Sequence, residues 1–253
     1  AEAEERTGAF AQALAWACQA TDVDPDEPGL LLLRAGLHAR LGQVQNARQT
    51  YDHVRRLCPD RADVLRARAA FLLKTGGAEK ALGDAERAMD IESCEASLAL
   101  VCDALTANGQ PEQALARSES SKVPFEHGDI LRLARSRAML ALRNFVAITS
   151  GPMQAPAGGH LAATLAYLAN GDLNRADFHA QSLHGPDGWE AHARVLVAQG
   201  RAPRAIELLQ LAIEADPLCA SSRALCGRVL LGQGKPQEAE EALARAVEID
   251  PTC

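Results

Sequence analysis

Histidine is the side chain in this sequence with the widest chemical use, because it binds metal ions and transfers protons near neutral pH. The seven histidines are His38, His53, His127, His160, His179, His184 and His192. They are scattered, and His179 and His184 are five positions apart, which places them on different faces of a helix. No HExxH, GxSxG, Walker or GxGxxG motif accompanies them. We therefore expect ordinary surface or groove histidines, and we predict no catalytic residue, no metal and no cofactor.

The cysteines carry no disulfide or zinc pattern either. They number seven, which is an odd count, and no two of them form a CxxC pair. They are Cys18, Cys58, Cys94, Cys102, Cys219, Cys226 and Cys253. We expect free thiols, which behave as small hydrophobic side chains where they are packed.

Two groups of arginines offer positive charge that an acidic partner segment could use. The first comprises Arg55, Arg56, Arg61, Arg66 and Arg68, and the second comprises Arg132, Arg135, Arg137 and Arg143. We favour a structural interpretation, in which the first group makes local ion pairs with Asp52, Asp60 and Asp63. The formal net charge of -7 and the aromatic content of 4% argue against general nucleic-acid binding. We predict no nucleic-acid partner.

The elements that position these side chains follow from a repeat. Residues 186–219 and 220–253 are two copies of one pattern with a period of 34 residues. The aligned pairs are Gly200 and Gly234, Ala205 and Ala239, Leu209 and Leu243, Ala212 and Ala246, and Pro217 and Pro251. Each copy reads as a first helix, a glycine turn, a second helix and a proline stop. The repeating unit is therefore predicted to be a pair of helices.

The same frame, projected backwards, divides the whole chain. Residues 1–27 predict an unpaired helix, at about positions 6–20, that corresponds to half a repeat. Three repeats follow over 28–127, then a divergent repeat and a Pro/Gly loop over 128–156, and three more repeats over 157–253. We expect all of them to form one continuous solenoid domain.

The divergent part departs from the frame in its composition. Serines and a proline interrupt the helical pattern after Ala114, and no glycine turn appears where the frame requires one. The spacing of apolar residues predicts a helix over 129–149, or a short pair broken near Arg143. The segment 150–159, SGPMQAPAGG, predicts a loop.

The residues at the fixed positions of this frame resemble the tetratricopeptide repeat family. The best match has Trp189 at position 4, Ala193 at 8, Leu196 at 11, Gly200 at 15, Ala205 at 20, Leu209 at 24, Ala212 at 27 and Pro217 at 32. Small residues at positions 8, 20 and 27 let helices approach closely. The resemblance implies an all-α fold, a right-handed superhelical solenoid of tandem antiparallel helix pairs. Sel1-like and armadillo repeats are the alternatives, and their periods fit less well.

The resemblance also implies a binding groove, because the first helices line the concave face in this family. Positions 2, 5, 9, 12 and 13 of each unit usually point into that groove. The nominated residues are Leu32, Arg40, Arg66, Lys74, Asp103, Leu161, Leu165, Leu168, Glu190, Arg194 and Arg228. For each one the alternative is a solvated side chain without a ligand. The Lys and Asn clamp of chaperone-binding members is absent, so capture of a chaperone tail is not expected.

These features predict a non-catalytic scaffold or adaptor that binds a peptide or helix of a partner and organises a multiprotein complex. The alternatives are a regulatory or substrate-recruiting segment of a larger enzyme and an envelope or secretion-system assembly factor. Self-association through the solenoid ends stays open, because no further helix would cover Leu243 and Val247.

The compartment is not fixed by the sequence. No apolar run reaches the roughly 20 residues that a membrane helix requires, so we predict no membrane insertion. A cytoplasmic location is favoured, and a periplasmic one stays open if a leader was removed.

Overall fold

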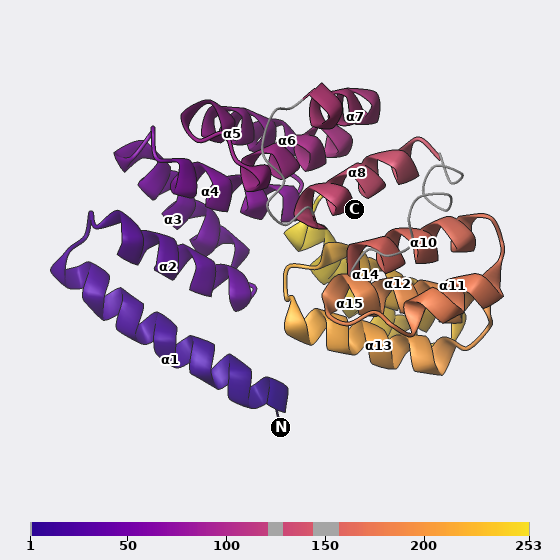
Figure 1. Ribbon diagram of the computed structural model, residues 1–253. Coiled ribbons are helices and arrows are strands. Elements are labelled where there is room, and N and C mark those ends of the chain that lie inside the picture. The colour runs from indigo at the N-terminus through magenta and orange to yellow at the C-terminus, as the bar shows by residue number, and fades with distance from the viewer. Residues whose placement is uncertain (1, 121–128, 144–156, 253) are drawn as a thin grey trace.

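The structure, a computed structural model, describes residues 2–120, 129–143 and 157–252. Every regular element in these ranges is an α-helix (Figure 1). In order, they are α1 (Glu2–Val23), α2 (Pro28–Arg40), α3 (Val44–Leu57), α4 (Ala62–Lys74), α5 (Ala78–Ile91), α6 (Glu95–Ala107), α7 (Pro111–Ser120), α8 (Asp129–Ala141), α10 (Ala157–Ala169), α11 (Leu173–Ala180), α12 (Pro186–Ala198), α13 (Ala202–Ala215), α14 (Ala220–Gly232) and α15 (Pro236–Ile249). None of these helices is long and apolar enough to cross a membrane.

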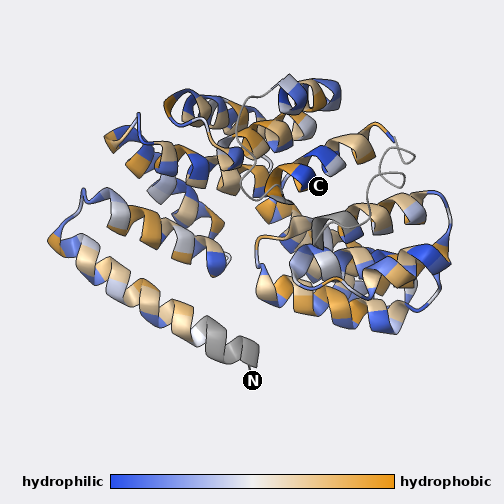
Figure 2. Cartoon of the chain, in the orientation of Figure 1, coloured by the Kyte–Doolittle hydropathy of each residue, from blue (hydrophilic) through white to orange (hydrophobic). Residues whose placement is uncertain are grey.

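Consecutive helices pack as antiparallel pairs. The pairs are α2 with α3, α4 with α5, α6 with α7, α10 with α11, α12 with α13, and α14 with α15. Helix α1 packs on α2, and α8 takes the place of a first helix because it packs on α6, α7 and α10. Apolar and hydrophilic residues alternate along the helices, as Figure 2 shows. The predicted all-α solenoid of tandem helix pairs is confirmed.

The turn inside each described pair contains a glycine with a positive φ. These glycines are Gly42, Gly76, Gly109, Gly171, Gly200 and Gly234, with φ between 67° and 76°. They occupy position 15 of the repeat frame, and the left-handed backbone region is one that glycine enters without a steric penalty. The predicted turn chemistry is therefore confirmed at every one of these pairs.

The small residues of the frame lie at the closest helix contacts. At position 8, Ala35, Ala69 and Ala193 have no exposed surface, and the thiol of Cys102 is equally buried. Larger side chains such as Leu98 fill the space between neighbouring pairs, also without exposure. Small and large residues thus share the core in the way that the repeat pattern predicts.

Helix α1 is longer than predicted. It spans Glu2–Val23, whereas the sequence pattern predicted about residues 6–20. At its end, the hydroxyl of Thr21 donates to the carbonyl oxygen of Cys18 at 2.9 Å, and Pro25 lies just beyond the last turn. These end effects lie outside the apolar pattern on which the prediction depended.

The divergent segment is only partly described. Helix α8 ends at Ala141, and Arg143 has a φ of 55°. Of the two predicted alternatives, this agrees with a break near Arg143 and not with one continuous helix over 129–149. Residues 121–128 and 144–156 lie outside the described ranges, and with them most of the predicted loop 150–159. The loop prediction is wrong for residues 157–159, which form the start of α10. Packing of α10 on α8, α11 and α12 outweighs the low helix propensity of two glycines.

The two ends of the solenoid meet. The guanidinium of Arg245 on α15 donates to the carbonyl oxygen of Gly42 at 2.9 Å. Lys74 at the end of α4 forms an ion pair with Asp216 at 2.5 Å. Ile249 is fully buried and belongs to the apolar cluster that also contains Phe71. The C-terminal end therefore lies against the turns of the first two helix pairs, near the middle of the molecule in Figure 1.

Alanine in place of Gly76 tests this closure, with Gly109 as the matched control. Both glycines have a positive φ, 72° and 74°, so either alanine costs about 1 kcal/mol in backbone strain. At Gly76 the new Cβ would also overlap Asp250 Oδ1, whereas at Gly109 it would meet open space. Asp250 Oδ1 accepts from the backbone N–H of Thr252 at 2.9 Å, and displacing it costs about another 1 kcal/mol.

We therefore expect Gly76→Ala to lower the free energy of unfolding about twice as much as Gly109→Ala in urea titrations. Equal losses at the two positions would contradict contact between the ends of the solenoid.

Candidate functional site

A pocket of about 320 Å³ lies between the first helices of four successive units. It is lined by Leu133, Ser136, Arg137 and Leu140 of α8, Leu161, Ala162 and Leu165 of α10, Asp187, Glu190, Ala191 and Arg194 of α12, and Ser221 of α14. First helices of neighbouring units contact each other, as α8 does α10 and α10 does α12, and the pocket lies along this row. One wall of the pocket is apolar and the other is charged.

The apolar wall consists of leucines from two neighbouring helices. Leu161 and Leu165 are four residues apart on α10, and Leu133 and Leu140 are seven apart on α8. These spacings place each pair on one face of its helix. All four side chains are partly buried, so each keeps a surface that a ligand could cover.

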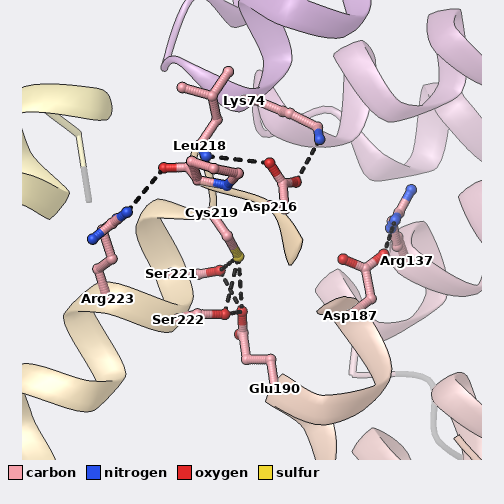
Figure 3. A network of polar contacts seen from close by, with 11 residues as sticks. Lys74, Arg137, Asp187, Glu190, Asp216, Leu218, Cys219, Ser221, Ser222 and Arg223 are labelled. Atoms are coloured by element: carbon pink, nitrogen blue, oxygen red, sulfur yellow. Dashed lines mark hydrogen bonds and ion pairs between the residues drawn. The ribbon is translucent and has the colours of Figure 1, made fainter. Parts of the chain in front are cut away.

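The charged wall is organised by Glu190, whose carboxylate has both oxygens engaged. Oε2 accepts from the hydroxyls of Ser221 at 2.6 Å and Ser222 at 2.7 Å (Figure 3). Oε1 accepts from the guanidinium of Arg194 at 2.7 Å. Burial alone would raise the pKa of Glu190, but these hydrogen bonds and the Arg194 charge outweigh it and lower the pKa. Glu190 therefore stays ionised and holds Arg194 in place.

Arg137 bridges two carboxylates at the edge of the same wall. Its guanidinium pairs with Asp103 of α6 at 3.0 Å and with Asp187 of α12 at 3.2 Å. Burial raises the pKa of Asp103, although the charge of Arg137 partly opposes this. Three helices, α6, α8 and α12, thus each supply one member of this network at the rim of the pocket.

Four of the predicted groove residues meet at this pocket. Leu161 and Leu165 form the apolar wall, and Glu190 and Arg194 form the charged wall. Asp103 lies one contact away, through Arg137. The repeat frame therefore predicted residues of two different units, up to 33 positions apart in the sequence, that line one pocket.

Other predicted groove residues are engaged in contacts within the fold. Leu32 and Leu168 are partly buried and pack against core clusters. Arg40 lies over the ring of Phe10, with 5.2 Å between the guanidinium carbon and the ring centroid.

Two more predicted cations form ion pairs. Arg66 pairs with Glu92 at 2.6 Å, and Lys74 pairs with Asp216. Arg228 is exposed on α14. Among the predicted groove cations, Arg40 and Arg228 are exposed and form no ion pair with a carboxylate of the described residues.

The sequence reasoning missed the part of the pocket that α8 supplies. Leu133, Leu140 and Arg137 lie in the divergent segment, where no repeat position was assigned. A usable signal was present, since Leu133 and Leu140 are spaced by two helical turns. Asp187 was also missed, although it lies at position 2 of its unit, which is one of the groove positions of the frame, and its ion pair with Arg137 reveals its role.

The first arginine group has the structural role that we favoured. Arg68 pairs with Asp52 at 2.7 Å and Arg61 pairs with Asp63 at 2.5 Å. Asp60 pairs with Arg87 at 2.7 Å, an arginine outside the predicted group. These local pairs leave little unsatisfied positive charge in this region for an acidic partner.

Two histidines contact each other, which the sequence spacing did not indicate. Nδ1 of His160 on α10 lies 3.1 Å from Nδ1 of His179 on α11, and the ring of Tyr167 stacks on His179. Burial lowers the pKa of His179, and the neighbouring His160 lowers it further. Within the described residues, no group of three or more metal-ligating side chains is present. We interpret the pair as part of the packing between the two helices.

Comparisons with known proteins agree with the repeat frame. The tetratricopeptide repeat family model matches residues 1–62 and 190–252. None of the curated proteins matches the chain in sequence. Among solved structures, the Cut9-Hcn1 heterotetramer of the APC/C has a TM-score of 0.52 at 14% identity, over 96% of this chain and 50% of that one. The present chain thus spans half the length of that protein.

Two further solved structures have the same fold. A tetratricopeptide repeat protein from Parabacteroides merdae has a TM-score of 0.51 at 15% identity, over 88% of this chain and 93% of that one. The human IFIT1 dimer with PPP-AAAA has a TM-score of 0.55 at 15% identity, over 94% of this chain and 68% of that one. The helix pairs, the glycine turns and the matched family model together show that the chain is built from tetratricopeptide repeats.

Proposed function

We propose that this protein is a non-catalytic scaffold or adaptor that binds a peptide or helical segment of a partner protein in its concave groove. Tetratricopeptide repeats generally mediate protein–protein interaction and complex assembly. The observation that carries the finer proposal is the pocket between α8, α10, α12 and α14, with its apolar and charged walls. We propose it as the centre of the binding surface, in a larger complex that the protein organises.

The size and the apolar wall of the pocket support a short segment as ligand. A volume of about 320 Å³ suits the side chains of a few residues and lies within the range of ligand sites. One leucine or phenylalanine of the partner, buried against Leu161 and Leu165, would contribute about 1.5 to 3 kcal/mol. An aliphatic or aromatic anchor is therefore the feature that we expect in the partner.

The charged wall supports orientation of that segment. Arg194 is held by Glu190, and Arg137 is held by Asp103 and Asp187. Side chains that are already ordered lose less rotamer entropy when they bind. The exposed parts of Arg137 and Arg194 would bind backbone carbonyls or a carboxylate of the partner.

Catalysis at this pocket finds less support than binding. A general acid or base needs a free oxygen and a pKa near the working pH. Both oxygens of Glu190 are hydrogen-bonded, and its pKa is lowered. These properties suit a structural carboxylate.

Replacing Leu161 with glutamate tests the proposal. The new carboxylate would stand where the partner's apolar anchor binds, and we expect at least a tenfold loss of partner affinity, since a buried unpaired charge is costly. The matched control is Leu211→Glu, which makes the same change at a side chain of α13 that is 44% exposed. Affinity purification followed by quantitative mass spectrometry measures partner recovery, and circular dichroism verifies folding. If the Leu161→Glu variant recovers as much partner as the Leu211→Glu variant, the proposal is wrong.

A further inference from the structure

The short turn between α13 and α14 joins the closure of the solenoid to the groove pocket. On one side of this turn, Asp216 Oδ2 accepts from Lys74 Nζ of α4 at 2.5 Å. On the other side, α14 begins at Ala220, and its first turn carries Ser221, which lines the pocket. One short stretch of chain therefore takes part in both the closure and the pocket (Figure 3).

Asp216 restricts the conformation of this turn through both of its carboxylate oxygens. While Oδ2 binds Lys74, Oδ1 accepts from the backbone N–H of Leu218 at 3.2 Å. A residue before a proline is confined to extended conformations, and Asp216 has a φ of -132° and a ψ of 92°. Leu218 is 4% exposed and belongs to the apolar cluster that also contains Leu72 of α4. The turn is thus held near α4 by an ion pair and by apolar packing.

The first turn of α14 holds the Glu190 carboxylate in the charged wall of the pocket. The hydroxyls of Ser221 and Ser222 both donate to Glu190 Oε2. The thiol of Cys219 donates to the same oxygen at 3.5 Å. If the turn and the start of α14 moved away from α4, Glu190 would lose these donors, which is costly because its side chain is only 12% exposed. A closed solenoid and an ordered charged wall therefore stabilise each other.

This arrangement is particular to the units of α12 and α14. Glu190 occupies position 5 of its unit, and the other units that follow the repeat frame have no carboxylate at that position. Their residues are Leu32, Arg66, Ala99, Leu161 and Ala224. The network is therefore a feature of this chain and not of the repeat pattern.

We infer that closure of the solenoid at Lys74 and Asp216 orders the charged wall of the pocket, so that both act as positioning residues for Arg194. In the closed arrangement the start of α14 holds Glu190, and Glu190 holds Arg194. A partner segment that binds Arg194 in this arrangement favours closure in turn, because linkage between two sites is reciprocal. This regulation of partner binding rests on the proposed function, whereas the link between closure and Arg194 does not.

Chemical modification of the protein alone tests this link. Phenylglyoxal modifies arginine side chains, and mass spectrometry measures the rate of modification at each residue. We expect Lys74→Ala to raise the rate at Arg194 about two- to fivefold, the range expected when an exposed ion pair is lost. Lys74→Arg keeps a positive charge opposite Asp216, so it should keep the rate of the wild type.

The matched control is Lys235→Ala. Lys235 is 52% exposed and pairs with Glu238 of α15, and Lys74 is 51% exposed, so the two substitutions remove equally exposed ion pairs. We expect no change at Arg194 in this control variant. Arg204 of α13 reports general unfolding, because it also forms an ion pair, and its rate should stay constant in every variant.

The reverse experiment starts from the pocket. Glu190→Leu keeps a side chain of similar volume but accepts no hydrogen bond from α14. We expect it to raise the rate at which an acetylating N-hydroxysuccinimide ester modifies Lys74, by about two- to fivefold, because linked sites affect each other in both directions. The rate at Lys235 should not change.

Each other result would overturn the inference. An unchanged rate at Arg194 in Lys74→Ala, or an equal rise in the control variant, would mean that the closure and the pocket are independent. So would an unchanged rate at Lys74 in Glu190→Leu. A parallel rise at Arg204 would assign the effect to general unfolding. No partner takes part in these measurements, so failure of the proposed function, which affinity purification detects, would leave these rates as they are.

Discussion

Replacement of Asp84 with alanine is expected to lower the free energy of unfolding by about 3 kcal/mol. The Asp84 side chain is only 7% exposed and pairs with Arg68, which is 15% exposed, and with Arg55 at 3.3 Å. Removing the carboxylate leaves the Arg68 guanidinium largely buried with one partner, Asp52. That remaining partner keeps the expected loss near the low end for a broken buried ion pair.

The matched control for Asp84 is Asp60→Ala. Asp60 is 66% exposed and pairs with Arg87, which is 51% exposed, so solvent screens the interaction and its loss should cost less than about 1 kcal/mol. Urea titrations followed by circular dichroism measure both variants. Similar losses in the two would mean that the arginine network is solvated, and would reopen the interpretation of this region as a surface for an acidic partner.

Replacement of Gly227 with valine is expected to cost about 2 to 3 kcal/mol, because it forces α14 away from α15. A Cβ at Gly227 would lie 2.6 Å from Leu243 Cγ and 3.1 Å from the carbonyl oxygen of Ala239. The leucine side chain can rotate, but the carbonyl belongs to the backbone of α15, so the helix itself must move. Gly227 stands at position 8 of its unit, where three other units have Ala35, Ala69 and Ala193, and it marks a close approach of α14 to α15.

The matched control for Gly227 is Gly83→Val. Gly83 is an exposed residue of α5, and a Cβ there would meet nothing within 4 Å. Because valine is a slightly better helix former than glycine, we expect a change within about 0.5 kcal/mol of zero. Thermal and urea unfolding of both variants measure the difference. A Gly227 variant as stable as the Gly83 variant would contradict the close packing of α14 on α15.

The repeat frame predicted most of the local structure, because its determinants lie within each 34-residue unit. Gly76 and Gly200 form the turns at position 15, and Ala69 and Ala193 are buried at position 8. These features depend on the conformational freedom of glycine and on side-chain size, and both follow directly from the residue type.

Features that join distant units could not be predicted in this way. Lys74 and Asp216 are 142 positions apart, and their contact depends on the accumulated rotation between successive helix pairs. Helix α8 contributes Leu133 and Arg137 to the pocket, but its unit does not follow the frame. Leu168 was assigned to the groove by position alone, whereas it packs into a core cluster. A position in the repeat frame predicts where a side chain points in an average unit of the family. The packing around that residue decides whether its side chain is exposed or buried in this protein.

The central claim, that a partner segment occupies the groove pocket, is tested most directly by site-specific photo-crosslinking. p-Benzoylphenylalanine would replace Leu161 in the pocket or, as a control, Leu211 on the outer helix α13. After irradiation in the cell, mass spectrometry would identify the crosslinked peptides. We predict discrete adducts from position 161 that share an aliphatic or aromatic anchor, and none of these from position 211. Adducts that are identical at both positions, or absent at position 161, would contradict binding in the groove.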